Sequence, residues 1–158
     1  MVEISVPTAL QTIASGGKAL SALAVFSKKA KGDQRALLLE LKDNLTCLDL
    51  VANDGVELIA ITDQLSTIEY ERLCKEGFDF NRLKRGKIAD LTSLRGTDLS
   101  SWRRKTTAEL VDSIYAKIRE MKIRYPLVAD NPKYRWPTRV NNIRKRIWLL
   151  LVHLNAHR

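Results

Sequence analysis

The C-terminal stretch from Lys133 to Arg158 combines a basic beginning with a strongly apolar end. Its apolar residues recur at three- and four-residue steps, the spacing that places side chains on one face of an α-helix. Neighbouring apolar residues widen this face until the helix is hydrophobic nearly all round, which is typical of a helix packed among several others. We therefore expect a closing helix that the rest of the chain encloses. Its repeating positions are Val140, Ile143, Ile147, Leu150 or Leu151, and Leu154.

The same spacing predicts helices upstream, and cap residues mark where several of them begin. Asp33 is suited to cap the second helix, and two capping boxes, Ser66 with Glu69 and Thr106 with Glu109, mark two later starts. A short apolar segment at 56–65 fits a helix better than a strand, because a lone strand would lack a partner. The expected helices cover 5–31, 34–52, 56–65, 67–76, 106–124 and the closing segment from Pro137 onward.

Two segments lack a helical period. The segment from Phe78 to Thr97 contains two glycines and scattered apolar anchors, which indicates an ordered, basic connector with one short helical turn. Tyr125 and Pro126 should end the fifth helix, and the proline-rich segment from Leu127 to Pro137 should form a loop. We expect one all-α domain covering residues 1–158, a helical bundle of five or six helices whose core is the second, fifth and closing helices.

Length and composition fit a soluble domain of ordinary size. The chain has 158 residues, of which 45% are hydrophobic and 28% charged. Cys47 and Cys74 lie far apart among apolar neighbours, so we expect both to be reduced thiols in the core. The N-terminus lacks the pattern of a secretory signal, and no stretch is apolar enough to span a membrane. A cytoplasmic location follows from these features.

The charge is unevenly distributed along the chain. The formal net charge is +9, but residues 1–79 carry eight Lys or Arg and twelve Asp or Glu, whereas residues 80–158 carry nineteen and six. The strongest contrast lies between the acidic segment 49–79 and the basic segment 82–105. Either these two segments lie together in the fold and cancel, or the basic segment is left for a partner.

Basic residues next to aromatic ones favour contact with a phosphate backbone, because cations neutralise phosphates and rings stack on bases. This pattern predicts a non-enzymatic interaction module, accessory to a larger effector, that presents its basic C-terminal half to an acidic partner. That partner is either nucleic acid or an acidic protein surface. The residues expected to bind it are Arg103, Arg104, Tyr134, Trp136, Arg139, Arg144 and Lys145.

An enzymatic alternative is carried by Arg146 and His153, which enclose six residues. This spacing resembles the active-site motif of HEPN ribonucleases, although that family usually has a polar residue where this chain has Ile147. The resemblance implies a metal-independent ribonuclease or toxin in which Arg146 holds a phosphate and His153 assists attack by the ribose 2′-hydroxyl. We expect no cofactor or metal, because the pair His153 and His157 lacks the glutamate and the third ligand of a zinc site.

Two further hypotheses concern apolar surfaces. The amphipathic N-terminal helix, followed by three lysines, is compatible with a membrane-active helical bundle that inserts at a membrane surface. The closing helix has more apolar surface than one groove would hide, so its far side predicts a homodimer or a partner complex. The expected interface residues are Ile147, Trp148, Leu149 and Val152, with Trp148 as the anchor.

Overall fold

The computed structural model describes residues 17–156, which form six α-helices, four 3-10 turns and no β-strand. The predicted all-α fold is therefore confirmed, while the part of the expected first helix before residue 17 lies outside the described residues. The α-helices are α2 (Gly17–Lys29), α3 (Gly32–Asn53), α4 (Leu58–Thr62), α5 (Ile68–Lys75), α6 (Thr107–Val128) and α7 (Trp136–Asn155). The 3-10 turns are η1 (Phe80–Arg82), η2 (Thr92–Leu94), η3 (Ser100–Trp102) and η4 (Pro132–Tyr134).

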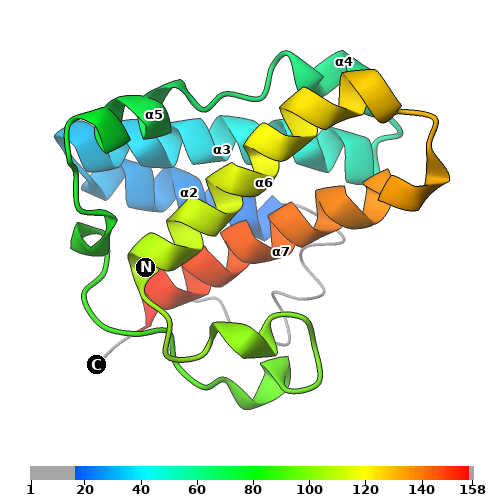
Figure 1. The fold of residues 1–158 in the computed structure, drawn as a ribbon. Coiled ribbons are helices and arrows are strands. Elements are labelled where there is room, and N and C mark those ends of the chain that lie inside the picture. The colour runs from blue at the N-terminus through cyan, green and yellow to red at the C-terminus, as the bar shows by residue number, and fades with distance from the viewer. Residues whose placement is uncertain (1–16, 157–158) are drawn as a thin grey trace.

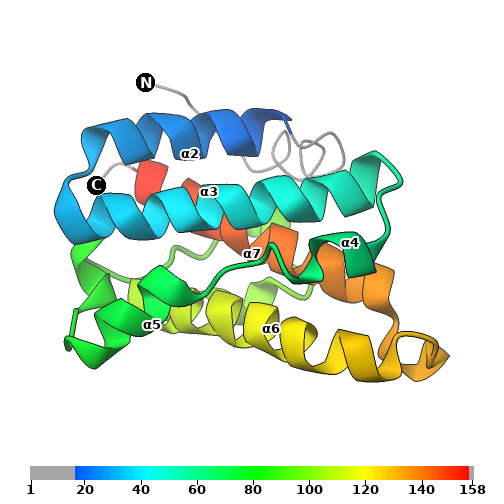
Figure 2. The same ribbon diagram turned by 90° about the horizontal axis from the view of Figure 1, so that it is seen from above.

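The closing helix α7 lies at the centre of the bundle, as its apolar pattern predicted. It packs against α2, α3 and α6, and in Figure 2 it is seen between α3 and α6. The short helices α4 and α5 pack against α3, and α4 also packs against α6 (Figure 2). Every side chain from 147 to 152 is buried, so the enclosed surface of α7 extends over more than one full turn.

The turn between α2 and α3 depends on a glycine. Gly32 has φ +56°, a left-handed conformation that costs glycine little and lets α3 run back antiparallel to α2 (Figure 2). Lys28 and Lys29 occupy the last turn of α2, where the helix dipole favours positive charge. The expectation that Asp33 caps α3 is wrong, because Lys31 holds the N-cap position and Asp33 lies in the first turn.

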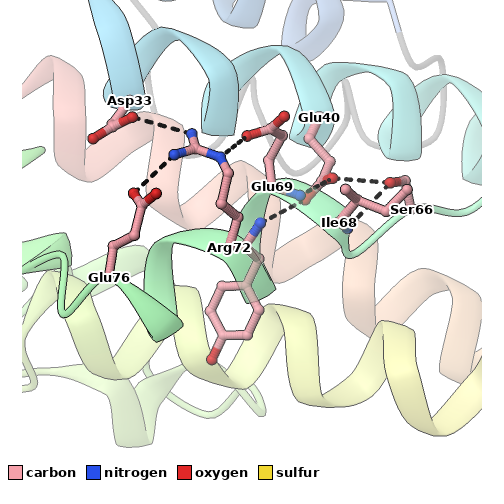
Figure 3. Close-up of polar contacts among 8 residues, drawn as sticks. Asp33, Glu40, Ser66, Ile68, Glu69, Arg72 and Glu76 are labelled. Carbon is pink, nitrogen blue, oxygen red and sulfur yellow. Dashed lines mark hydrogen bonds and ion pairs between the residues drawn. The ribbon is translucent and has the colours of Figure 1, made fainter.

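The start of α5 is capped from a distant helix, which corrects the predicted capping box of Ser66 and Glu69. Glu40 of α3 accepts the backbone N–H of Glu69 at 2.8 Å and that of Tyr70 at 3.1 Å. The Ser66 hydroxyl also donates to Glu40, at 2.9 Å (Figure 3). A buried carboxylate on α3 thus satisfies N–H groups that the helix end leaves free.

Arg72 gives the α3–α5 contact a second set of polar links. Its guanidinium lies 3.0 Å from Asp33 of α3, and it also pairs with Glu69 at 2.9 Å and Glu76 at 2.8 Å (Figure 3). Three carboxylates of the acidic half are therefore occupied by one arginine of the same half. They are not available to neutralise the basic segment.

Helix α6 begins as the sequence predicts and ends later. Thr106 and Glu109 form the expected capping box, with Glu109 accepting the Thr106 N–H at 2.7 Å. The predicted exit at Tyr125 and Pro126 is wrong, since α6 continues to Val128 with Pro126 inside it. The last turn is held by Trp136, whose ring packs edge-on against Tyr125 and whose Nε1–H donates to the Val128 carbonyl at 3.3 Å.

The connector between α5 and α6, residues 76–106, contains three 3-10 turns, and two of them lie in the segment from Phe78 to Thr97 where one helical turn was expected. It is ordered because its apolar side chains Phe80, Ile88, Leu94, Leu99 and Trp102 are buried. Residues 88–105 form a loop whose ends are joined by Ile88 N–H to the Lys105 carbonyl and Arg104 N–H to the Ile88 carbonyl, both at 2.9 Å. In Figure 1 this loop lies below α7.

The two cysteines are free thiols, but they do not share one environment. Cys47 is half-buried, and burial together with the charge of Asp43 raises the pKa of its thiol. Cys74 is exposed, so the expectation of two core thiols is wrong for this residue. The reason is local, since on α5 the neighbouring Leu73 faces the core.

Candidate anion-binding surface

The basic segment is not cancelled by the acidic one. Among the described residues, Arg85 and Asp79, 3.0 Å apart, form the ion pair that joins segment 82–105 to segment 49–79. Other acids of the first half pair with Arg72, or, in the case of Glu71, with Arg119 of α6 at 3.3 Å. The basic half therefore keeps most of its charge for the surface around the connector, α6 and α7.

One predicted binding residue, Arg144, is in the core. Its Nε donates to Asp49 of α3 at 2.7 Å, and its side chain is 3% exposed. Arg144 also donates to the side chain of Asn141 at 2.9 Å. The prediction that it contacts a polyanion is therefore wrong, because α3 covers this side of α7 and supplies the counter-charge.

The aromatic pair at the start of α7 is a packing unit rather than an open stacking platform. Trp136 is buried, and the ring of Tyr134 stacks on it with centroids 5.4 Å apart. The guanidinium of Arg139 lies 5.3 Å from the Tyr134 ring centre and 5.5 Å from that of Trp136. Trp136 cannot stack on a base in this position, so the predicted role of the pair is wrong for Trp136.

Arg103 and Arg104 lie on the exposed connector, and Lys145 joins that connector to α7. Lys145 Nζ is 3.5 Å from Asp98 Oδ1, and Arg103 is 3.6 Å from Asp90. Arg104 is exposed and has a left-handed backbone, with φ +65°. The cations predicted from the sequence thus lie on two neighbouring parts of the surface, one on the connector and one on α7.

The structure adds one cation that the sequence did not mark, Lys117. A shallow groove between α6 and α7 has Lys117, Glu120, Met121, Trp136, Arg139, Asn142 and Ile143 along its walls. Arg139 pairs with Glu120 at 3.0 Å, whereas, within residues 17–156, neither Lys117 nor Arg146 forms an ion pair. We call Lys117, Arg139 and Arg146 the groove cations.

The groove cations lie close enough to repel one another. Burial, followed by the charge of Arg146, lowers the pKa of the Lys117 ammonium, and the charge of Glu120 offsets this in part. Burial likewise lowers the pKa of Arg146, against the influence of Asp98. Arg146 donates from Nη1 to the Asn142 carbonyl at 3.0 Å, while its buried Nε has no hydrogen-bond acceptor. An anion in the groove would relieve this repulsion.

A sequence signal for Lys117 existed but was weak. Lys117 lies three residues after Ile114 and four before Met121, so it belongs to the edge of the apolar face of α6. A lysine in such a position holds its aliphatic stem against apolar neighbours and its ammonium at the rim. The spacing shows that Lys117 borders the core, but which helix lies opposite is not encoded in it.

The two residues of the ribonuclease alternative occupy different environments. His153 is buried, and its Nε2 lies 2.8 Å from the hydroxyl of Thr107. Since that hydroxyl donates its own proton to the Lys84 carbonyl at 2.7 Å, it accepts from the imidazole N–H. A small cavity of about 100 Å³ is lined by His153 but not by Arg146. The imidazole of His153 is therefore buried and hydrogen-bonded to Thr107, and it does not share a cavity with Arg146.

The predicted interface residues are buried within the chain itself. Ile147, Trp148 and Leu149 are at most 1% exposed, and Val152 is 8% exposed. The expectation of an interface there is wrong, because α2, α3 and α6 cover α7 and leave no surplus apolar face. The closing helix is the centre of this bundle.

The described residues contain neither a metal-binding cluster nor a membrane-spanning helix. Within residues 17–156, no group of three or more His, Cys, Asp or Glu is placed to hold a metal ion. In the same part of the chain, no helix is long and apolar enough to cross a membrane. His157 and residues 1–16, where the N-terminal helix was expected to begin, lie outside these residues.

Comparisons of the chain with models of protein families, with curated proteins and with solved structures found no match. The class that the fold defines is an all-α helical bundle. Its function is therefore argued from its own residues.

Proposed function

We propose that this helical bundle is a non-enzymatic module that binds the phosphate backbone of nucleic acid along the α6–α7 groove. The observation that carries the proposal is that Lys117 and Arg139 line one groove whose walls have a single carboxylate, Glu120, and that Arg146 lies near enough to Lys117 to lower its pKa. Phosphates lying over these cations would be held by charge-assisted hydrogen bonds, and their counterions would be released.

The arrangement of the groove cations suits a repeating anion. Arg139 and Arg146 are seven residues apart on α7, which corresponds to about 10 Å along the helix axis. Lys117 faces them from α6, and Lys145 and Arg103 continue the basic surface toward the connector. An extended chain of phosphates can meet several of these cations at once, whereas a single carboxylate side chain would meet one.

Binding rather than catalysis is favoured by the state of the groups that chemistry would require. His153 is buried and uses its Nε2 on Thr107, and no second histidine lies within the described residues. Apart from Glu120, which is paired with Arg139, the charged residues of the groove are lysine and arginine, which are poor general bases at neutral pH. Recognition of phosphates needs no group that loses a proton.

The proposal is tested by fluorescence anisotropy with labelled single-stranded and duplex oligonucleotides. The affinity should fall steeply from about 50 to about 200 mM salt, since the logarithm of affinity follows the logarithm of salt with a slope near the number of phosphates neutralised. Lys117→Met and Arg139→Met should each weaken binding and lower the slope by about 1. Arg119→Met is the matched control, because Arg119 is on α6 but pairs with Glu71 of α5, away from the groove.

Binding that does not depend on salt, or no binding at low salt, would refute the proposal. Equal losses in Arg119→Met and Lys117→Met would show attraction to net charge without a site. Competition by polyglutamate as strong as that by an unlabelled oligonucleotide would assign the groove to an acidic protein instead.

A further inference from the structure

The connector contains a second basic site, separate from the α6–α7 groove. A cavity of about 330 Å³ opens in the loop of residues 88–105, between the segment at Asp90 and the turns η2 and η3. Leu94 and Leu99 are buried and line its inner side, and the hydrogen-bonded ends of the loop hold its walls in place. The cavity is therefore part of a fixed structure rather than a gap between mobile side chains.

Two arginines from opposite walls of this cavity converge on one carboxylate. Arg95 and Arg103 each place a guanidinium nitrogen 3.6 Å from Asp90 Oδ2. This separation exceeds normal hydrogen-bond length, so Asp90 orients the two guanidinium groups without consuming their N–H donors. Both side chains remain largely exposed, at 66% and 61%.

The donors of Arg95 and Arg103 match one chemical group well. A guanidinium presents paired N–H donors that bind two oxygens of an anion at once. A carboxylate has only two oxygens and is satisfied by one such fork, whereas a terminal phosphate has three and can engage both arginines. Its charge of about −1.5 to −2 also exceeds that of the Asp90 carboxylate with which it competes.

We propose that this connector cavity binds a phosphomonoester of nucleotide size, with its terminal phosphate between Arg95 and Arg103. The volume is near the lower end of small-molecule sites and exceeds what phosphate alone would fill. In this proposal the partly apolar body of a nucleoside lies against the apolar lining of the cavity, which the partly buried Leu91 forms together with Leu94 and Leu99. The same chemistry is offered by a free nucleoside monophosphate and by the 5′-phosphate end of a nucleic-acid strand.

Isothermal titration calorimetry of the full chain at low salt tests this inference with four probes. Three of these are adenosine 5′-monophosphate, adenosine and inorganic phosphate, and the fourth is a 5′-phosphorylated oligonucleotide, with its unphosphorylated form as the control. The monophosphate should bind at least about tenfold more tightly than adenosine or inorganic phosphate, since the site provides contacts for both parts. A preference for the phosphorylated oligonucleotide over its unphosphorylated form that is lost in Arg95→Met and kept in Lys117→Met would identify the strand end as the source.

Variants of the cavity give the sharper test. Arg95→Met and Arg103→Met should each weaken binding of the monophosphate about tenfold or more. Arg85→Met should not, because Arg85 is an equally exposed connector arginine that pairs with Asp79, away from the cavity. Asp90→Asn should tighten binding of the monophosphate, since it removes a competing negative charge and keeps the shape of the side chain.

The result that would overturn the inference is equal binding of adenosine and its monophosphate, or unchanged binding in Arg95→Met and Arg103→Met. Lys117→Met should leave nucleotide binding intact. Failure at the cavity is therefore distinguishable from failure at the α6–α7 groove.

Discussion

Arg144 of α7 donates from Nε to Asp49 of α3 at 2.7 Å, in a place where the arginine side chain is 3% exposed and the aspartate 9%. This buried ion pair joins the central helix α7 to α3. It also removes from the surface an arginine that lies in the middle of the most basic run of the sequence. The free basic surface is consequently built from other residues.

The Asp49–Arg144 pair should be costly to break from one side. Arg144→Met leaves a buried carboxylate without its partner, so we expect the free energy of unfolding to fall by about 3–5 kcal/mol. Asp49→Leu should lower the free energy of unfolding by a similar amount. The double variant should recover a large part of the loss, because two apolar side chains need no counter-charge. Urea denaturation of all four proteins measures this, and single losses below about 1 kcal/mol would mean that the pair is solvated.

The Glu40 cap should hold α5 in place. Glu40→Ala leaves the N–H groups of Glu69 and Tyr70 and the Ser66 hydroxyl without this acceptor, so we expect a loss of about 2–3 kcal/mol in unfolding free energy. Hydrogen exchange at the amides of Glu69 and Tyr70 should accelerate. Glu76→Ala serves as the control, because its ion pair with Arg72 is exposed and should contribute less than about 1 kcal/mol. Unchanged amide exchange in Glu40→Ala would contradict the capping role.

Lys117 should strengthen oligonucleotide binding and slightly destabilise the fold. Its pKa is lowered by burial and by Arg146, so the folded state disfavours its charge. Lys117→Met should therefore raise the unfolding free energy slightly, by no more than about 0.5 kcal/mol, while weakening oligonucleotide binding. Thermal melting and anisotropy measured on the same samples provide both values.

The pH dependence of the same variant gives an independent check. Since the folded pKa of Lys117 lies below its ordinary value of 10.5, the unfolded chain binds more protons in the interval between the two. The unfolding free energy of the wild type should rise with pH there, and Lys117→Met should lack this component. A variant that melts earlier than the wild type would instead show that the lysine stem supports packing.

His153 should act in packing rather than catalysis. His153→Ala removes the donor to Thr107 and leaves a small cavity, so we expect a loss of about 1–3 kcal/mol in unfolding free energy. The wild-type protein should leave RNA intact in the absence of metal. Metal-independent RNA cleavage that His153→Ala abolishes without lowering the melting temperature would revive the ribonuclease alternative.

Trp148 should stabilise the fold of each chain. It is fully buried, so Trp148→Ala should cost about 3–5 kcal/mol through the cavity that it leaves. Trp148→Phe should cost less, because it keeps an aromatic ring and removes an indole N–H that has no hydrogen-bond partner. Sedimentation equilibrium should give the same mass for the wild type and Trp148→Phe. A wild-type dimer that this variant dissociates would restore the interface hypothesis.

The sequence by itself determined the helices. Apolar spacing gave α3, α6 and α7 to within a few residues, and Thr106 with Glu109 marked the start of α6, because these signals concern residues within one or two turns of each other. The apolar surplus of α7 was visible as well. The spacing did not show whether other helices of the chain or a second molecule would cover this surface, because it does not specify what lies opposite.

The tertiary structure alone decided which charges are free. Arg139 and Arg144 are both arginines of the same basic stretch of the sequence. Arg144 is nevertheless buried against Asp49, 95 positions away, while Arg139 reaches the α6–α7 groove. Glu40 likewise caps a helix that begins 28 positions later, where a local capping box was expected. Local signals reflect backbone hydrogen bonding and helix faces, which adjacent residues determine. Burial and neutralisation depend on which distant side chains the packing of α3, α6 and α7 brings together.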